Sequence, residues 1–369
     1  MSPHLLSLAL FVGGLVALVV GADVLVRGAS KLALALGISP LVVGLTVVAF
    51  GTSAPEMAVS AGAVLSGQTG LALGNVVGSN IFNLLLILGL SALVAPLAVH
   101  LQIIRQEMPV LILGSGLVLW LAQDGTLSAG DGALLLTCLL GYTTALVLQS
   151  RRITRSLAAQ APAPAATHTQ RAWDDRVPVQ LALIAVGLAL LVLGSDWLVT
   201  ASVNFARSLG VSEVVIGLTI VAAGTSMPEV ATSVAAALKG ERDIAVGNVV
   251  GSCTFNLLGC LGLSGVLAGS AGLPVVQSLL QFDLWIMLAA TLVCVPLFFT
   301  GREISRLEGA LLLVGFALYL TYVVLAARGT PGLWAPQAVV WGVAAPMVAA
   351  ALLASLQRAL RPSPRQRAE

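Results

Sequence analysis

Charged side chains are scarce in this sequence. Only 9% of its 369 residues are Asp, Glu, Lys or Arg, whereas 58% are hydrophobic, and the mean hydropathy is +1.01. Soluble globular proteins carry about 25% charged residues, so this composition excludes a soluble domain. Apolar runs of roughly 18 residues or more recur along the chain, and each is long enough to cross a hydrocarbon core of about 30 Å as a helix. We therefore predict an all-α polytopic membrane protein.

Two missing sequence patterns exclude other classes of membrane protein. The apolar segments lack the alternation of polar and apolar residues that a membrane β-barrel requires. An H-E-x-x-H motif is also missing, so an intramembrane metalloprotease is not indicated. We expect no enzymatic activity and no cofactor. The four cysteines lie inside apolar runs and are expected to be inert packing residues.

Glycine, proline and charged residues divide the apolar sequence into eleven predicted spans. The first run lacks a basic segment before it, so we count it as a spanning helix rather than a cleaved signal peptide. A polar stretch from Ser150 to Arg176 contains APAPAAT and five arginines, and we interpret it as a flexible linker. The predicted spans are residues 5–27, 40–66, 70–96, 103–122, 128–149, 178–201, 212–238, 243–269, 280–299, 305–327 and 336–357.

An internal repeat relates the two halves. Residues 21–89 align without a gap on residues 194–262, and 37 of these 69 positions are identical. Each half is therefore predicted to carry the same five-helix unit. Because five is odd, the second unit begins on the opposite side of the membrane, and the repeats are predicted to be inverted. The expected organisation is a first repeat (1–149), a cytoplasmic linker (150–176), a second repeat (177–329), and an extra helix with a basic tail (330–369).

The positions of lysine and arginine predict the orientation. With the N-terminus outside, 16 of the 18 basic residues fall on the cytoplasmic side, and only Arg207 and Arg328 fall outside. Cytoplasmic loops are enriched in these residues, so this orientation is favoured. We expect an integral protein of the cell (inner) membrane whose N-terminus is outside and whose central linker and C-terminus are cytoplasmic.

Two glutamates lie close to the middle of apolar spans. Glu56 and Glu229 occupy equivalent repeat positions, in the segments GTSAPE and GTSMPE. An ionisable group at that depth is expensive to insert and commonly marks an ion pathway. We predict that each half contributes one glutamate to a single central cation site.

Each glutamate follows residues that are expected to break its helix. Pro55 and Pro228 lack an N–H donor, so the carbonyl groups of Gly51 and Gly224 lose their helical partners. Broken helices are tolerated in a membrane where they line a cavity or coordinate an ion. An ordinary proline kink is the alternative, but the neighbouring buried glutamate favours an ion site.

The following span of each half carries a polar stripe. Its members recur every four residues and therefore project from one helix face. They are Asn75, Ser79 and Asn83 in the first half and Asn248, Ser252 and Asn256 in the second. The stripe supplies oxygen ligands, although interhelical hydrogen bonding is an equally good interpretation for Asn75 and Asn248. The glycines expected to bring this face close to a neighbouring backbone are Gly74, Gly78, Gly247 and Gly251.

The expected ligands are hard oxygen donors. The motifs offer two carboxylates, carbonyls, amides and hydroxyls, and they contain no histidine or thiolate pair. This set suits Ca²⁺ or Na⁺ better than a transition metal. Two ionised glutamates balance one Ca²⁺, two Na⁺ or two protons, so exchange of Ca²⁺ for monovalent cations is favoured.

The paired segments G-T-S-x-P-E and G-N-x-x-G-S-x-x-x-N resemble the alpha repeats of the cation/Ca²⁺ exchanger superfamily, to which the sodium/calcium exchangers and their prokaryotic relatives belong. The resemblance covers both halves and implies a ten-helix exchanger core of two inverted repeats. It implies central Ca²⁺ ligands at Glu56 and Glu229 and at the carbonyls of Thr52 and Thr225. The flanking Na⁺ sites that it implies share the glutamates and use Ala49, Ser53, Ser79, Ala222, Ser226 and Ser252.

Two features depart from that pattern. Many family members have an aspartate at one or both of the positions occupied by Asn83 and Asn256, so this site lacks a third carboxylate, and the coupling ion and stoichiometry stay open. The eleventh span has no counterpart in the ten-helix core.

The function expected from these observations is a secondary active antiporter that exchanges Ca²⁺ for Na⁺, with a Ca²⁺/H⁺ antiporter as the alternative. A cation channel is the competing class, and saturable counterflow would separate it from a transporter. The expected partners are inorganic cations and the lipid bilayer, nucleic acid is not expected, and the oligomeric state is open.

Asp23 and Asp196 form a further equivalent pair in the repeat. Each lies in a G-[AS]-D-x-L-V context near the end of a long span. We interpret them as structural caps, with Arg27 placed to pair with Asp23, and a role in ion access is the alternative.

Overall fold

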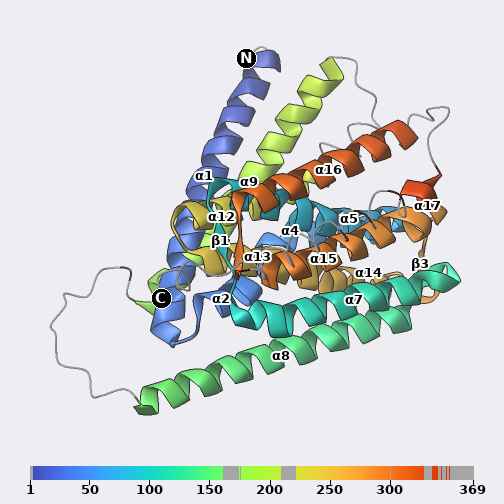
Figure 1. The fold of residues 1–369 in the computed structure, drawn as a ribbon. Coiled ribbons are helices and arrows are strands. Elements are labelled where there is room, and N and C mark those ends of the chain that lie inside the picture. Colours follow the sequence, from blue (N-terminus) through green and yellow to red (C-terminus); the bar gives the residue numbers. More distant parts are fainter. Residues whose placement is uncertain are drawn as a thin grey trace, which may run out of the picture.

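The molecule is an all-α bundle of long, apolar helices (Figure 1). The computed structural model describes residues 3–160, 174, 176–208, 222–299, 301–327, 335–339, 342, 346 and 349. Within these residues, eight helices are long and apolar enough to cross a membrane, and a bent helix pair adds a ninth span. The predicted all-α polytopic class is confirmed, whereas the inverted-repeat arrangement stays a prediction. The first part of the seventh predicted span and most of the eleventh lie outside the described residues.

The helices follow the predicted spans. The α-helices are α1 (Pro3–Leu36), α2 (Pro40–Val43), α3 (Ala49–Thr52), α4 (Ala54–Leu65), α5 (Thr69–Ile81), α6 (Leu88–Val94), α7 (Met108–Leu121), α8 (Ala129–Gln160), α9 (Val177–Ser208), α11 (Ala222–Thr225), α12 (Met227–Leu238), α13 (Arg242–Phe255), α14 (Leu261–Leu267), α15 (Leu284–Phe299), α16 (Arg306–Ala327) and α17 (Pro336–Val339). The π-helical turns are η1 (Gly44–Val48), η2 (Phe82–Ile87), η3 (Ile103–Glu107), η7 (Asn256–Cys260) and η9 (Leu279–Asp283). The 3₁₀ turns are η4 (Ala122–Asp124) and η8 (Gly269–Ala271).

Local sequence explains where the first two helices meet. α1 ends at Leu36 because Gly37 adopts a positive φ of 61°, which a glycine tolerates without strain. α2 then begins with Pro40, whose missing N–H is no loss in a first helical turn. The Ser39 hydroxyl caps that turn by accepting the N–H of Val42 at 3.3 Å.

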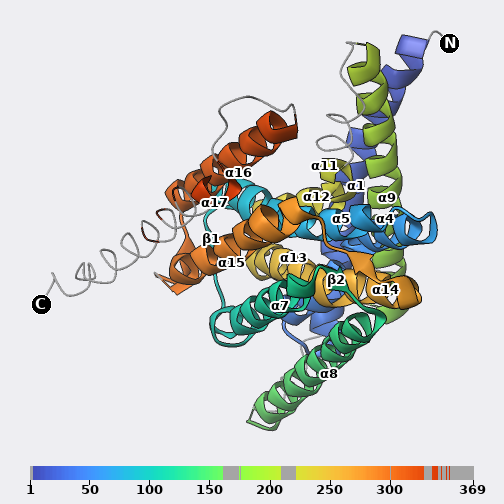
Figure 2. The same ribbon diagram turned by 90° about the vertical axis from the view of Figure 1, so that its right-hand side faces the viewer.

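The long helices α1 and α9 lie side by side in both views (Figures 1 and 2). A Cβ atom added at Gly14 would lie 2.8 Å from the carbonyl oxygen of Gly194, and one added at Gly21 would lie 2.9 Å from that of Gly187. At such distances, neither helix can carry a Cβ atom where the two backbones cross. Small residues spaced by two turns on each helix allow this approach, as in many membrane helix pairs.

The two spans that carry the polar stripes are the most central. The most apolar stretch of the span from Thr69 to Val94 is 78% buried, and that of the span from Arg242 to Leu267 is 94% buried. The corresponding values for α9 and α16 are only 28% and 17%, so those helices lie at the periphery. The polar stripes are therefore inside the bundle, where a polar side chain needs a partner or a ligand.

Four two-residue strands connect the halves at the bundle ends. β1 (Leu97–Ala98) pairs antiparallel with β4 (Glu303–Ile304), and β2 (Thr126–Leu127) pairs antiparallel with β3 (Leu273–Pro274). Each pair joins a loop of the first half to a loop of the second. The loop after the third span of the first half thus meets the loop after the fourth span of the second half.

The polar stretch between the halves begins differently from our prediction. α8 continues to Gln160, so residues 150–160 are helical rather than an irregular linker. No proline or glycine interrupts the chain between residues 150 and 160, which is consistent with a continuous helix.

Candidate cation-binding site

The two GTSxPE segments form matching breaks in their spans. α3 and α4 meet at Ser53 with a bend of 42°. Ser53 has φ −81° and ψ 3°, and Ser226, at the equivalent break between α11 and α12, has φ −90° and ψ 7°. Both serines therefore leave the helical region in the same way, as the prolines that follow require. The predicted helix breaks at Gly51–Pro55 and Gly224–Pro228 are present.

Each break places its glutamate in the first turn of a new helix. Glu56 lies in the first turn of α4, and Glu229 lies in the first turn of α12. The N-terminal end of a helix carries partial positive charge, which favours a carboxylate at this position. Both side chains are fully buried. Within the described residues, neither forms a salt bridge with a lysine, arginine or histidine.

The breaks exchange hydrogen bonds across the two halves. The Ser226 hydroxyl donates to Glu56 Oε1 at 2.8 Å, and the Ser53 hydroxyl donates to Glu229 Oε1 at 3.1 Å. Ser252 also donates to Glu229 Oε1, at 3.5 Å. The second oxygen of each glutamate, Oε2, is buried and has no hydrogen-bond partner among the described residues. The two carboxylates therefore lie close to each other inside the bundle.

Threonine hydroxyls and serines continue this network. The Thr52 hydroxyl donates to Asn248 Oδ1 at 3.0 Å and lies 3.4 Å from the Ser252 hydroxyl. The Ser226 hydroxyl lies 3.4 Å from that of Ser79. The Thr225 side chain interacts with Glu56 across the halves. The network brings predicted site residues from α3, α5, α11 and α13 together.

Asn75 and Asn248 have a positioning role. Asn75 Nδ2 donates to the Ser60 hydroxyl at 3.0 Å and to the Glu56 carbonyl at 3.3 Å. Asn248 makes the equivalent bonds, to the Ser233 hydroxyl at 2.9 Å and to the Glu229 carbonyl at 3.5 Å. These bonds hold the helix that carries each glutamate against the next span. The interhelical interpretation of these two asparagines is therefore confirmed by their contacts.

Asn83 and Asn256 lie at the π-helical turns η2 and η7. Asn83 is fully buried, and its side-chain amide lies beside the Cys253 thiol. Asn256 Oδ1 accepts a bond from the Cys260 thiol at 3.5 Å, while its Nδ2 atom has no described partner. π-Helical turns occur frequently at functional sites because they redirect side chains. The roles of both amides as ion ligands stay a prediction.

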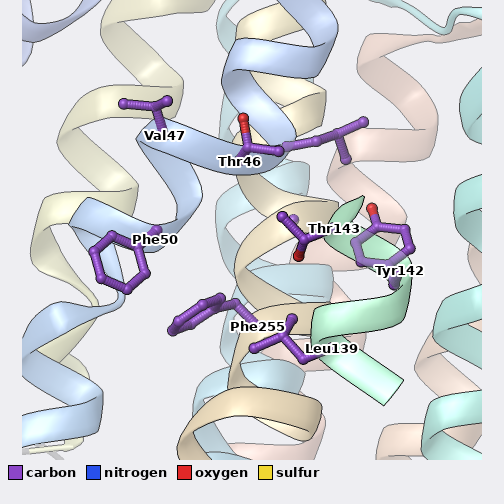
Figure 3. A pocket seen from close by; sticks show the side chains of 9 residues that line it. Thr46, Val47, Phe50, Leu139, Tyr142, Thr143 and Phe255 are labelled. Atoms are coloured by element: carbon purple, nitrogen blue, oxygen red, sulfur yellow. The ribbon is translucent and has the colours of Figure 1, made fainter. Parts of the chain in front are cut away.

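The cavity in Figure 3 is separate from this site. It has a volume of about 300 Å³ and is lined by Leu45, Thr46, Val47, Phe50, Leu139, Tyr142, Thr143, Gly251 and Phe255. Phe50 and Phe255 meet there edge to face, with ring centroids 5.1 Å apart. Neither glutamate lines it, so it offers no cation ligands of the predicted kind.

Sequence reasoning missed two carboxylate–tyrosine pairs, in which Glu107 is buried and Asp283 is half-buried. Tyr142 donates to Glu107 at 2.5 Å, and Gln102 donates to the same carboxylate at 2.9 Å. In the second half, Tyr319 donates to Asp283 at 2.9 Å. Both carboxylates lie near the start of a span and end a π-helical turn, η3 or η9. Because both carboxylates lie near the end of a predicted span, the sequence did not distinguish them from surface residues.

The interpretation of Asp23 and Asp196 as caps is wrong. α1 and α9 continue well beyond them, to Leu36 and Ser208, so neither residue ends a helix. Asp23 pairs with Lys239 of the second half at 2.7 Å rather than with Arg27. An i,i+4 pair is weak on an exposed surface, and a partner from another helix has replaced it.

Arg27 instead binds the polar stretch between the halves. Its guanidinium lies 2.7 Å from Asp174, and Lys31 lies 3.6 Å from the same carboxylate. The hydrogen bond from Arg27 and the charge of Lys31 hold the pKa of the Asp174 carboxyl below its ordinary value. These pairs and the Asp23–Lys239 bridge lie on the same end of α1.

The chain is similar to known exchangers over most of its length. The family model described as "Sodium/calcium exchanger protein" matches residues 6–148 and 179–325. "Putative antiporter CaxA" of Alkalimonas amylolytica is 38% identical over 83% of this chain and 95% of that protein. "Inner membrane protein YrbG" of Escherichia coli K12 is 37% identical over 86% of this chain and 96% of that protein. "Sodium/calcium exchanger MaX1" of Methanosarcina acetivorans is 32% identical over 83% of this chain and 95% of that protein.

Solved structures agree with this assignment. The sodium-calcium exchanger NCX_Mj, soaked without Na⁺ and Ca²⁺, superimposes with a TM-score of 0.73 at 29% identity, covering 86% of this chain and 99% of that one. The shared fold, the duplicated motifs and the family match over both halves lead to one conclusion: the chain is a membrane antiporter of the sodium/calcium exchanger protein family.

Proposed function

We propose that the protein exchanges Ca²⁺ for Na⁺ through one central site that both halves build. The observation that carries this proposal is the reciprocal bonding of the breaks, in which Ser226 binds Glu56 and Ser53 binds Glu229. These bonds bring both carboxylates into one buried site. The central Ca²⁺ ligands are Glu56 and Glu229 with the carbonyls of Thr52 and Thr225.

Charge balance explains why the ions exclude one another. Two carboxylates buried without a described basic partner repel each other, and a bound cation removes that repulsion. One Ca²⁺ or two Na⁺ bring the site to neutrality, whereas both together leave excess positive charge in a region of low dielectric. The flanking Na⁺ sites that we propose share the glutamates and are completed by Ala49, Ser53, Ser79, Asn83, Ala222, Ser226, Ser252 and Asn256.

We propose that the halves are inverted repeats, residues 1–149 and 177–329, separated by residues 150–176 and followed by residues 330–369. The strand pairs support this, since β1 meets β4 at one end and β2 meets β3 at the other. Equivalent loops of the two halves therefore lie at opposite ends. The contact of Asp174 with Arg27 and Lys31 supports a cytoplasmic linker beside this basic end of α1. We assign the protein to the inner membrane, with its N-terminus outside.

Alternating access requires that the site open to one side at a time. α1 packs extensively against α12, and Lys239 bridges to Asp23 at the end that we assign to the cytoplasm. In the described part of the chain, no contact of similar extent joins α9 to α4. We interpret this as a form that is closed towards the cytoplasm. The bridge is partly exposed, and such bridges contribute only about 0–1 kcal/mol, so it does not lock the transporter.

A Ca²⁺/H⁺ antiporter is the second candidate. The observation that favours it is that Asn83 and Asn256 are neutral. A carboxylate at either position would strengthen Na⁺ binding, and this chain has none there. Uptake of ⁴⁵Ca²⁺ into proteoliposomes tests the two candidates. An outward Na⁺ gradient at equal pH drives accumulation if Na⁺ is the coupling ion. Uptake that responds only to a pH gradient would reject Na⁺ coupling, and uptake without saturable counterflow would indicate a channel.

A further inference from the structure

Ser195, which lies on α9 in the G-[AS]-D-x-L-V segment beside Asp196, binds the backbone of the second break. Its hydroxyl donates to the carbonyl oxygen of Gly224 at 2.5 Å, and the serine is only 6% exposed. Gly224 stands four residues before Pro228, so this is the carbonyl that the proline deprives of its helical donor. A side chain from a different helix thus supplies the bond that α12 cannot make.

One turn further along α9, Val199 contacts the same break. A Cβ atom added at Gly224 would lie 2.0 Å from Cγ2 of Val199. Ser195 and Val199 are four residues apart and therefore project from one side of the helix. The break is held by a hydroxyl and confined by a methyl group, so its backbone has little room to turn.

This bond constrains a proposed cation ligand. The Gly224 carbonyl and the Thr225 N–H belong to one planar peptide unit, so fixing the carbonyl fixes the rotation of that plane. The next carbonyl along the chain is that of Thr225. We propose that Ser195 is a positioning residue that sets the affinity of the second half-site for Ca²⁺ by orienting the Thr225 carbonyl. The inference rests on the proposed role of Thr225 in the exchange site.

The first half lacks the equivalent contact. The repeat places Ala22 where the second half has Ser195, and alanine has no hydroxyl. A Cβ atom added at Gly51 would instead meet the Leu188 side chain of α9, at 2.5 Å. α9 therefore meets the glycine of the second break through a hydrogen bond and the glycine of the first break through an apolar side chain. The two half-sites are chemically unequal although their motifs are nearly identical.

Equilibrium binding of ⁴⁵Ca²⁺ to the purified, full-length protein tests this inference. Ser195→Ala should weaken Ca²⁺ binding about tenfold, the effect of about 1.4 kcal/mol. Ser195→Thr keeps the hydroxyl and should bind within about twofold of the parent, since less than 0.5 kcal/mol is at stake. Ser202→Ala removes a hydroxyl from the same helix two turns from Ser195 and serves as the matched control, with unchanged affinity expected.

Each outcome either supports or overturns the inference about Ser195. Equal Ca²⁺ affinity for Ser195→Ala and Ser202→Ala would overturn the inference, as would a Ser195→Ala protein that loses thermal stability while its remaining folded fraction binds normally. Because binding is measured without an ion gradient, a parent protein that binds Ca²⁺ but does not exchange it for Na⁺ would refute the proposed function and leave Ser195 to be judged on affinity. Absence of Ca²⁺ binding by the parent would overturn both.

Discussion

Replacing Gly251 by alanine should damage the site while leaving the protein folded. α13 crosses the first broken span at this glycine. A Cβ atom added there would lie 2.8 Å from the Ala49 Cβ and equally close to the Cα and carbonyl oxygen of Leu45. Two of these three atoms belong to the backbone, so no side-chain rotation relieves the contact. The methyl group must push α3 and η1 away from α13.

The distances give the size of the shift. Ordinary contact begins near 3.4 Å, so the backbones must separate by about 0.6 Å. Metal sites require ligand distances correct to about 0.2 Å, and Ala49 and Thr52 lie on the displaced segment. Overpacking costs about 1–3 kcal/mol, but a helical Gly→Ala change recovers about 1 kcal/mol of helix propensity. Stability should therefore fall little, and Ca²⁺ affinity should fall about tenfold or more.

The assay separates these two effects. Thermal unfolding in detergent reports stability, and the KM of ⁴⁵Ca²⁺ uptake into proteoliposomes reports the site. Gly141→Ala is the control, because Gly141 is an exposed glycine of α8 with no described neighbour within 4 Å of an added Cβ. A normal KM for Gly251→Ala would refute the reasoning, since it would show that the site tolerates displacement of the first break.

Three further outcomes are expected. Glu56→Gln and Glu229→Gln should each abolish Ca²⁺ transport without preventing membrane insertion, because each removes half of the negative charge of the proposed site. Near-normal uptake by either variant would be incompatible with a shared site. Asn256→Asp should strengthen Na⁺ coupling and make uptake pH-dependent, because it adds a third carboxylate, and Na⁺ titrations of uptake at several pH values measure this. Strongly electrogenic exchange by the parent would show that the charge balance is too simple. A cysteine placed in residues 161–173 should resist impermeant thiol reagents in intact cells, and labelling from outside would reverse the orientation.

The sequence was sufficient to predict the features that occur in both halves at equivalent positions. Glu56 and Glu229, their prolines and the two stripes stand out because each occurs twice at equivalent positions. Ser60 and Ser233 carry the same signal, since they are identical, equivalent in the repeat and four residues after each glutamate on the same helix face. Attention to hydroxyls on that face would have found the partners of Asn75 and Asn248.

Features that differ between the halves were harder to predict. Ser195 contacts Gly224 from a helix that is remote in sequence, and its counterpart Ala22 gives no hint of a shared role. Asp23 pairs with Lys239 of the other half because the two side chains are close in space, and the i,i+4 spacing to Arg27 did not predict this. The glycine prediction is confirmed for Gly247 and Gly251, which closely approach the first broken span. For Gly74 and Gly78, the equivalent segment of the second half lies outside the described residues.

The central claim is that the two glutamates form one site rather than two. The stoichiometry of ⁴⁵Ca²⁺ binding to the purified protein tests it most directly, with Na⁺ as competitor and with Glu56→Gln and Glu229→Gln in parallel. We predict one Ca²⁺ per chain, competitive displacement by Na⁺, and loss of all binding in either variant. Two Ca²⁺ per chain, with one retained after either substitution, would contradict the shared site.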